Sequence, residues 1–238
     1  MLAGCCILVI YFGGNMRSLF LLFLILITLP VHSLEIKKYD CKRYIAGNDH
    51  TQVEITCDKP RDDLFKSAKY KLLRYQRSYK PQTIKKYLKT IVICEKLRAG
   101  NEKWVRGTYN LKQKSLFIEV DRETDDLEYV FHHEFNSILL LTNKNLKNII
   151  SKWHQSTHKE YGKVRVDNSK LDWEGKHTVI RRLGFLFPYS TTSFENDFNV
   201  MAAYYKSGYL KHILKSVSYR YPLIKNKYKI IKTFYNQY

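Results

Sequence analysis

The chain after its N-terminal apolar run begins with short strand and helix patterns. Leu34–Asp58 alternates irregularly, and its clearest period-two piece, Gln52–Cys57, predicts a short strand or hairpin. A helix is predicted to begin at Asp62 and to stop before Pro81. Its apolar positions recur at helical spacing: Leu64, Phe65, Ala68, Leu72, Leu73 and Tyr75. A second short helix follows through Ile84, Tyr87 and Leu88.

Three strand patterns follow and lead into a long amphipathic helix. Thr90–Cys94, Trp104–Tyr109 and Ser115–Val120 are rich in β-branched and aromatic residues. Their short connections predict an antiparallel meander. The next helix is predicted to be capped by Thr124 or Asp125, with acidic residues in its first turn. Its apolar positions include Leu127, Val130, Phe131, Ile138 and Leu141.

The C-terminal half shows mainly helical patterns. A polar region from Asn143 to Arg182 has no clear period and is expected to wrap over a cleft. Ser193 is a good N-cap for the helix that follows it. Two basic amphipathic helices are predicted at Tyr209–Tyr219 and Pro222–Tyr235, the second opened by its proline.

These patterns predict an α+β fold with a small antiparallel sheet followed by a mainly helical part. The length suits one domain over residues 34–238. Within it, a mixed α/β part at 34–122 precedes a mainly helical part at 123–238.

The first 33 residues have the features of a secretory signal peptide. Met16-Arg17 precedes an uninterrupted apolar run at 19–27, and cleavage is predicted after Ser33, with Met16 as the start. A membrane anchor is the alternative. However, residues 13–15 and Arg17 break the apolar stretch into pieces shorter than the roughly 20 residues of a spanning helix. We therefore expect export, to the periplasm, the cell surface or the medium.

Three cysteines remain after the predicted cleavage: Cys41, Cys57 and Cys94. Because an exported protein meets an oxidising compartment, we expect one disulfide and one remaining thiol. A Cys41–Cys57 pair would close a short loop between two extended segments, although the sequence leaves the pairing open. No C-x-x-C is present, so neither redox catalysis nor a cysteine zinc site is indicated.

The chain is strongly basic, with a formal net charge of +19. Such a charge suits an acidic partner, and an exported protein meets anionic envelope surfaces. The basic residues are spread from Lys37 to Lys232, and no zinc-knuckle, RNA-recognition or helix-turn-helix pattern is visible. The sequence therefore does not predict nucleic-acid binding.

One helix segment nearly matches the zinc-protease motif H-E-x-x-H. In that motif two imidazoles one helical turn apart hold Zn²⁺, and the glutamate activates the water on the metal. His133 and Glu134 supply the first half, but Ser137 stands where the second histidine is needed. His132 does not repair the motif, since the residue four positions after it is Asn136.

The order of elements resembles the secreted zinc metallopeptidases related to anthrax lethal factor, a gluzincin-like family with a zincin-like fold. Members of that family carry H-E-x-x-H on one helix, and a downstream helix supplies a glutamate as the third zinc ligand. A tyrosine seven residues before that glutamate assists the oxyanion. The downstream helix reads like S-x-E-E-D-F-A-E, and Ser193–Val200 is similar. The resemblance covers the layout from Leu64 onward, but only two short segments in sequence.

The resemblance implies a role for five positions. It places His133 on the first zinc ligand, Glu134 on the general base and Tyr189 on the auxiliary tyrosine. Ser137 stands at the second histidine and Asn196 at the ligand glutamate. A neutral hydroxyl and a carboxamide oxygen are poor replacements for these two zinc ligands.

Other side chains are candidates for the missing ligands. Glu195 and Asp197 each lie about 100° around the helix from Asn196, so either would need a register shift. His132 is adjacent to the motif. Further histidines come from the polar region: His154, His158 and His177.

His133-Glu134 thus has three interpretations: a degenerate site kept as a scaffold, a live site with different ligands, or a coincidence on an amphipathic helix. An active protein would use zinc held partly by His133 to hydrolyse peptide bonds, with Glu134 as base and Tyr189 at the oxyanion. The alternative is an inactive pseudo-peptidase that binds a peptide or protein in the envelope or outside the cell.

Overall fold

The computed structural model of the chain describes residues 34–39, 44–46, 53–100, 103–120, 126–157, 160–164 and 173–238. The predicted signal peptide at 1–33 lies outside these ranges, as do Cys41, Thr124, Asp125 and His158. Within the described ranges, no helix has both the length and the apolar character needed to cross a membrane.

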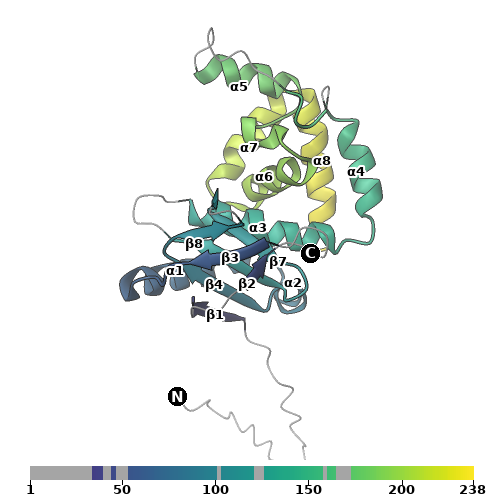
Figure 1. Cartoon of the computed structure of the whole chain (residues 1–238). Helices are drawn as coiled ribbons and strands as arrows, with labels where there is room; N and C mark the ends of the chain where they lie inside the picture. The colour runs from purple at the N-terminus through teal and green to yellow at the C-terminus, as the bar shows by residue number, and fades with distance from the viewer. Residues whose placement is uncertain are drawn as a thin grey trace, which may run out of the picture. The chain divides into compact units, whose positions relative to one another are not determined.

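The first sheet has the strand order β1–β4–β8–β7 and mixes parallel with antiparallel pairs (Figure 1). Its strands are β1 (Glu35–Lys38), β4 (Thr90–Cys94), β8 (Ser115–Glu119) and β7 (Gly107–Asn110). β4 pairs in parallel with β1 and β8, whereas β7 is antiparallel to β8. The predicted meander is therefore wrong. After β4 the chain leaves this sheet and re-enters it only at β7, so β8 runs beside β4 in the same direction.

The second sheet, with the order β2–β3–β5–β6, is antiparallel throughout. β2 (Tyr44–Ala46) and β3 (Val53–Cys57) form the predicted hairpin. β5 (Leu97–Ala99) and β6 (Lys103–Trp104) extend it during the excursion between β4 and β7. The α+β class is confirmed, but the antiparallel sheet is this one and not the sheet predicted from Thr90–Cys94, Trp104–Tyr109 and Ser115–Val120.

Alternate residues of β4 and β8 point to opposite faces of the first sheet, as the strand repeat requires. One set joins the main core under the helices: Ile91, Ile93, Leu116 and Ile118. The other set joins a smaller core with the second sheet: Val92, Cys94 and Phe117, with Ile55 and Leu97. Burial on both faces explains why these strands read as continuous apolar runs.

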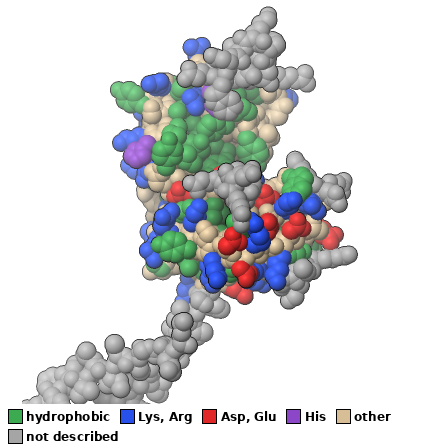
Figure 2. Space-filling view, turned by 90° about the vertical axis from the view of Figure 1, so that its left-hand side faces the viewer, with side chains coloured by type: hydrophobic (Ala, Val, Ile, Leu, Met, Phe, Trp, Pro, Cys, Tyr) green, Lys and Arg blue, Asp and Glu red, His purple; other side chains and the backbone are tan. Residues whose placement is uncertain are grey.

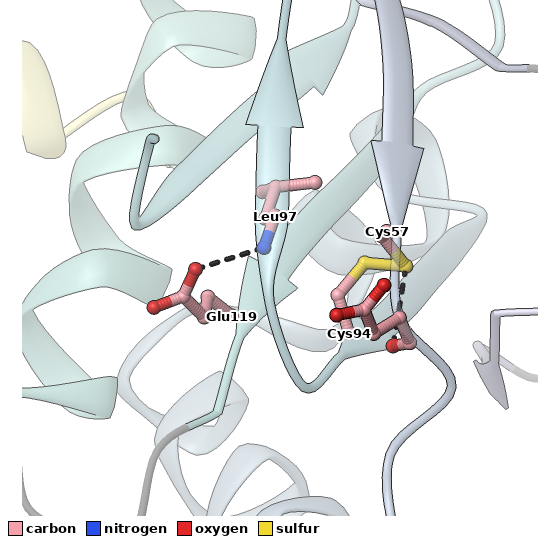
Figure 3. The surroundings of a disulfide bond; sticks show 5 residues. Cys57, Cys94, Leu97 and Glu119 are labelled. Carbon is pink, nitrogen blue, oxygen red and sulfur yellow. Dashed lines mark hydrogen bonds between the residues drawn. A yellow bond between two sulfur atoms is a disulfide. The ribbon is translucent and has the colours of Figure 1, made fainter. Parts of the chain in front are cut away.

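A disulfide links the two sheets by joining Cys57 at the end of β3 to Cys94 at the end of β4 (Figure 3). The two Cα atoms are 5.5 Å apart, within the usual span of a bridge. One disulfide was expected, but the pairing Cys41–Cys57 is wrong, because Cys57 lies beside Cys94. Next to the bridge, the Glu119 carboxylate accepts a hydrogen bond from the Leu97 backbone N–H at 2.8 Å (Figure 3).

Replacing Cys57 and Cys94 together by serine should lower the free energy of unfolding by roughly 2–4 kcal/mol, because the bridge restrains the unfolded chain. The bonded positions are 37 residues apart, which makes the closed loop a long one. Urea unfolding with and without reductant measures the effect. Reductant should shift the midpoint of the native protein but not that of the double variant, and an unshifted native midpoint would contradict the prediction.

The first helices agree with their predictions, except for the N-cap of α3 (Leu127–Leu141). α1 (Asp62–Tyr75) and α2 (Pro81–Tyr87) match their predictions, and α3 packs on β7, β8, α1 and α6. The predicted cap of α3 by Thr124 or Asp125 is replaced by an N-cap at Asp126. The Asp126 carboxylate makes no cap bond and instead accepts a hydrogen bond from Arg106 at 2.7 Å.

The C-terminal part is helical, as predicted (Figure 1). α6 (Phe194–Lys206) follows Ser193, whose Oγ accepts a hydrogen bond from the Asn196 N–H at 3.1 Å. α7 (Leu210–Arg220) and α8 (Pro222–Tyr235) pack against α6. The polar region contains two helices that its weak period did not indicate: α4 (Leu146–His154) and α5 (Trp173–Arg182). A short 3-10 turn, η2 (Pro188–Thr191), precedes α6.

A buried ion pair lies among these helices. Lys227 on α8 and Asp197 on α6 are both fully buried, with Nζ 2.6 Å from Oδ2. The same Asp197 oxygen accepts hydrogen bonds from Trp153 Nε1 at 2.7 Å and from the Tyr161 hydroxyl at 2.9 Å. Lys227 also donates to the Gly184 carbonyl at 2.6 Å. The pair therefore joins α4, α6 and α8 to the turn after α5.

Candidate functional site

The motif residues of α3 divide between two environments. His133 and Glu134 line a cavity, whereas His132 and Asn136 are buried in the core. The His133 Nδ1 atom lies 3.2 Å from Glu134 Oε1. Its other ring nitrogen, Nε2, is buried and has no hydrogen-bond partner among the described residues. The ring is thus held at one nitrogen and open at the other.

The cavity has a volume of about 460 Å³, within the range of ligand sites. Its walls come from β6, β7, α3 and η2: Trp104, Val105, Arg106, Gly107, Tyr129, Val130, His133, Glu134 and Tyr189. Gly107 allows the strand to approach α3 closely. A Cβ at this position would lie 2.6 Å from Val130 Cγ1 and 2.7 Å from Glu134 Cγ.

Tyr189 lines the same cavity as the motif residues His133 and Glu134. Its ring centre is 5.9 Å from that of His133, and its hydroxyl donates to Asn196 Oδ1 at 3.0 Å. The ring is half exposed, but desolvation of the hydroxyl raises the pKa of Tyr189 to about 12, with smaller contributions from Glu134 and Glu195. Tyr189 is therefore a hydrogen-bond donor at neutral pH. The structure brings His133, Glu134 and Tyr189 together, as the resemblance implied.

The position of the second histidine is part of a buried amide network. Ser137 Oγ accepts a hydrogen bond from Asn199 Nδ2 at 2.6 Å. Asn199 Oδ1 accepts in turn from Asn136 Nδ2 at 2.6 Å, and Asn136 Oδ1 accepts from the Tyr235 hydroxyl at 2.9 Å. All these groups are buried. Sequence reasoning missed Asn199, although it lies three residues after Asn196 on the same helix.

The other candidate ligands lie elsewhere. His132 is fully buried, and its Nδ1 is 3.0 Å from the Tyr79 hydroxyl, so it is directed into the core and not toward the cavity. Glu195 is partly exposed in the first turn of α6 and does not line the cavity. His154 is exposed, and His177 is buried near Arg181. None of these four side chains joins His133.

The described donor set does not fit a zinc site. No three His, Cys, Asp or Glu side chains are grouped to hold a metal ion within the described part of the chain. Ser137 is engaged by Asn199, and the Asn196 side chain is engaged by Tyr189 and Thr192. Of the described side chains at the implied ligand positions, His133 alone keeps an unpaired ligating nitrogen, whereas a structural or catalytic zinc site uses three or four strong ligands.

Among the comparisons with known proteins, a match to a solved structure bears on the fold alone. No protein-family profile matches the sequence, and no curated protein matches it. A crystal structure of "a putative zinc-binding metallo-peptidase" from Bacteroides caccae is similar, with a TM-score of 0.51 and 13% sequence identity. The likeness covers 85% of this chain and 78% of that one. The chain therefore has a metallopeptidase-like fold.

Proposed function

We propose that this chain is a metallopeptidase-like protein without the peptidase zinc site, which binds an extended peptide segment in the His133 cavity. The observation that carries this proposal is the buried Ser137–Asn199–Asn136 network. In this network Ser137, which stands at the position of the second zinc ligand, accepts a hydrogen bond from an amide inside the core. This arrangement is explained by a peptidase site of the lethal-factor-related type that has lost two metal ligands and is kept as a binding scaffold.

The surroundings of the cavity suit an extended peptide. β7 is the edge strand of the first sheet and supplies Gly107 to the cavity wall. An exposed sheet edge can take an added strand through main-chain hydrogen bonds, while a neighbouring pocket selects a side chain. Trp104 and Tyr189 are about half exposed at the cavity, with exposed fractions of 54% and 52%. Exposed aromatic rings of this kind are frequent anchors of protein interfaces.

Export is part of the proposal. The apolar run at 19–27 and the predicted cleavage after Ser33 support a location in the periplasm, at the cell surface or outside the cell. The Cys57–Cys94 bridge supports it independently, because disulfides form and persist in oxidising compartments. The proposed partner is a peptide or protein and not a nucleic acid.

Metal-dependent hydrolysis is the second candidate. It is favoured by one observation: His133 Nε2 is buried without a partner among the described residues, beside the Glu134 carboxylate. A hydrolase would need further zinc ligands that the described residues do not group with His133.

A peptide library passed over the immobilised chain tests the proposal. We expect Tyr189→Ala to raise the Kd of a retained peptide by roughly tenfold or more, since an anchor residue of the cavity is lost. Tyr219→Ala is the matched control, because Tyr219 is a highly exposed tyrosine on α7, outside the cavity lining. Peptide cleavage that Glu134→Gln abolishes would replace this proposal by the hydrolase. Retention of no peptide and cleavage of none would contradict both.

A further inference from the structure

A second cavity, outside the His133 site, is lined by arginine side chains. It lies where α5 and α7 end and α8 begins, and its volume is about 460 Å³. Its lining residues are Arg181, Arg182, Arg220, Tyr221, Pro222 and Leu223. None of the proposed peptide-binding residues takes part in it.

The fold holds these arginines in place. Gly184, with φ 91°, turns the chain after α5, and a Cβ at this position would lie 3.1 Å from Leu223 Cβ. Lys227 Nζ donates to the Gly184 carbonyl at 2.6 Å and is itself tied to Asp197. The end of α5, with Arg181 and Arg182, is therefore fixed beside the first turn of α8.

The three guanidinium groups have no carboxylate partner among the described residues. Arg181 reaches His177 Nδ1 at 3.4 Å and lies over the Phe187 ring, and its Nε is buried with no partner in the described structure. Arg182 and Arg220 are exposed. The first turn of α8 also has neither an acidic residue nor a side-chain cap, so it adds backbone N–H groups without an intrahelical acceptor.

Arginine is concentrated at this cavity, and the part of the chain around it is basic. Only 12 of the 41 basic residues of the chain are arginine, yet three of them meet at this cavity. Residues 173–238 contain eleven Lys or Arg against three Asp or Glu. In Figure 2, acidic side chains gather over the lower, strand-bearing part, and the upper, helical part shows mainly apolar and basic ones. The helical part thus has a positive field.

We propose that this arginine cavity binds a phosphate group carried by a larger molecule. The planar guanidinium fork matches phosphate oxygens in pairs, which the point charge of lysine does not. Three such forks, which have no acidic partner among the described residues, suit a group with more than one negative oxygen. The cavity is far larger than a phosphate ion, so it leaves room for the rest of the ligand. A soluble phosphate ester and a lipid headgroup share this chemistry.

Titration calorimetry with pyrophosphate and sedimentation with vesicles test this inference on the mature chain. The vesicles contain either phosphatidylcholine alone or phosphatidylcholine with phosphatidylglycerol. The double variant Arg182→Gln/Arg220→Gln removes two exposed side chains of the cavity. The matched control, Arg74→Gln/Arg77→Gln, removes the same charge at exposed positions of α1 and the turn after it. Circular dichroism establishes that both variants are folded.

We expect the cavity variant to weaken binding by roughly tenfold or more and the control to change it little. Loss of pyrophosphate binding would assign the site to soluble phosphate esters, and loss limited to anionic vesicles would assign it to a lipid headgroup. Equal weakening in both variants would mean general charge attraction and would overturn the inference, as would an absence of binding to either probe. Peptide binding at the His133 cavity should be unchanged in the cavity variant, so the two proposals fail separately.

Discussion

Replacing Lys227 by methionine should lower the free energy of unfolding by about 3–5 kcal/mol, because it leaves a buried charge without its partner. Burial lowers the pKa of Lys227, and the attraction of Asp197 opposes this shift. Burial raises the pKa of Asp197. In the variant, the Asp197 carboxylate would keep only the hydrogen bonds from Trp153 and Tyr161. Urea unfolding followed by circular dichroism measures the loss.

Two companion variants make this result specific. Lys225→Met, at an exposed position of the same helix, should change the stability by no more than about 0.5 kcal/mol. Adding Asp197→Asn to Lys227→Met should recover part of the loss, because a neutral amide oxygen can still accept from Trp153 and Tyr161. If Lys227→Met is no more destabilising than Lys225→Met, the ion pair does not hold the helical part together.

Acidification should destabilise the protein through His132, by about 1.4 kcal/mol for each pH unit below about 6.5. Burial, with a smaller contribution from Lys206, lowers the pKa of His132 to about 3. The unfolded chain, with an ordinary histidine pKa, therefore binds a proton that the folded chain refuses. The contribution of His132 to stability is complete above about pH 6.5 and is lost progressively as the pH falls toward 3.

Unfolding free energies at several pH values, for the native protein and for His132→Gln, isolate this contribution. The difference between the two should shrink as the pH falls from 7 to 5, since glutamine does not titrate. His154→Gln, at an exposed histidine, should leave the pH dependence unchanged. Parallel pH profiles for the native protein and His132→Gln would show that His132 is not held neutral in the folded state.

Local patterns predicted most of the helices but not α4 and α5, and they could not predict long-range strand pairing. α1 and α8 carry their own period and termini, so their bounds follow from nearby residues. The direction of β8 relative to β4 depends on β5 and β6, the two strands of the second sheet that lie between them in sequence. The Cys57–Cys94 bridge depends on the same arrangement, and for that reason cysteine spacing gave the wrong pairing.

The candidate site, too, was only partly predictable from the sequence. The grouping of His133, Glu134 and Tyr189 was predicted, because the family pattern encodes it in order and spacing. The role of Asn199 was not, because it arises from a contact with Ser137, 62 positions away. Gly107 was missed for the same reason, since its importance lies in the approach of β7 to α3. The hydrogen bond between Asn199 and Ser137 distinguishes the observed arrangement from a zinc site.

The metal content of a protein comprising residues 34–238 tests the central claim most directly. Elemental mass spectrometry would be applied to protein purified without a chelator or affinity tag, beside His133→Ala. We predict no zinc above background in either protein, because the described residues give His133 no partner ligands. About one zinc per chain in the native protein, lost in His133→Ala, would contradict the account and establish a metal site at this cavity.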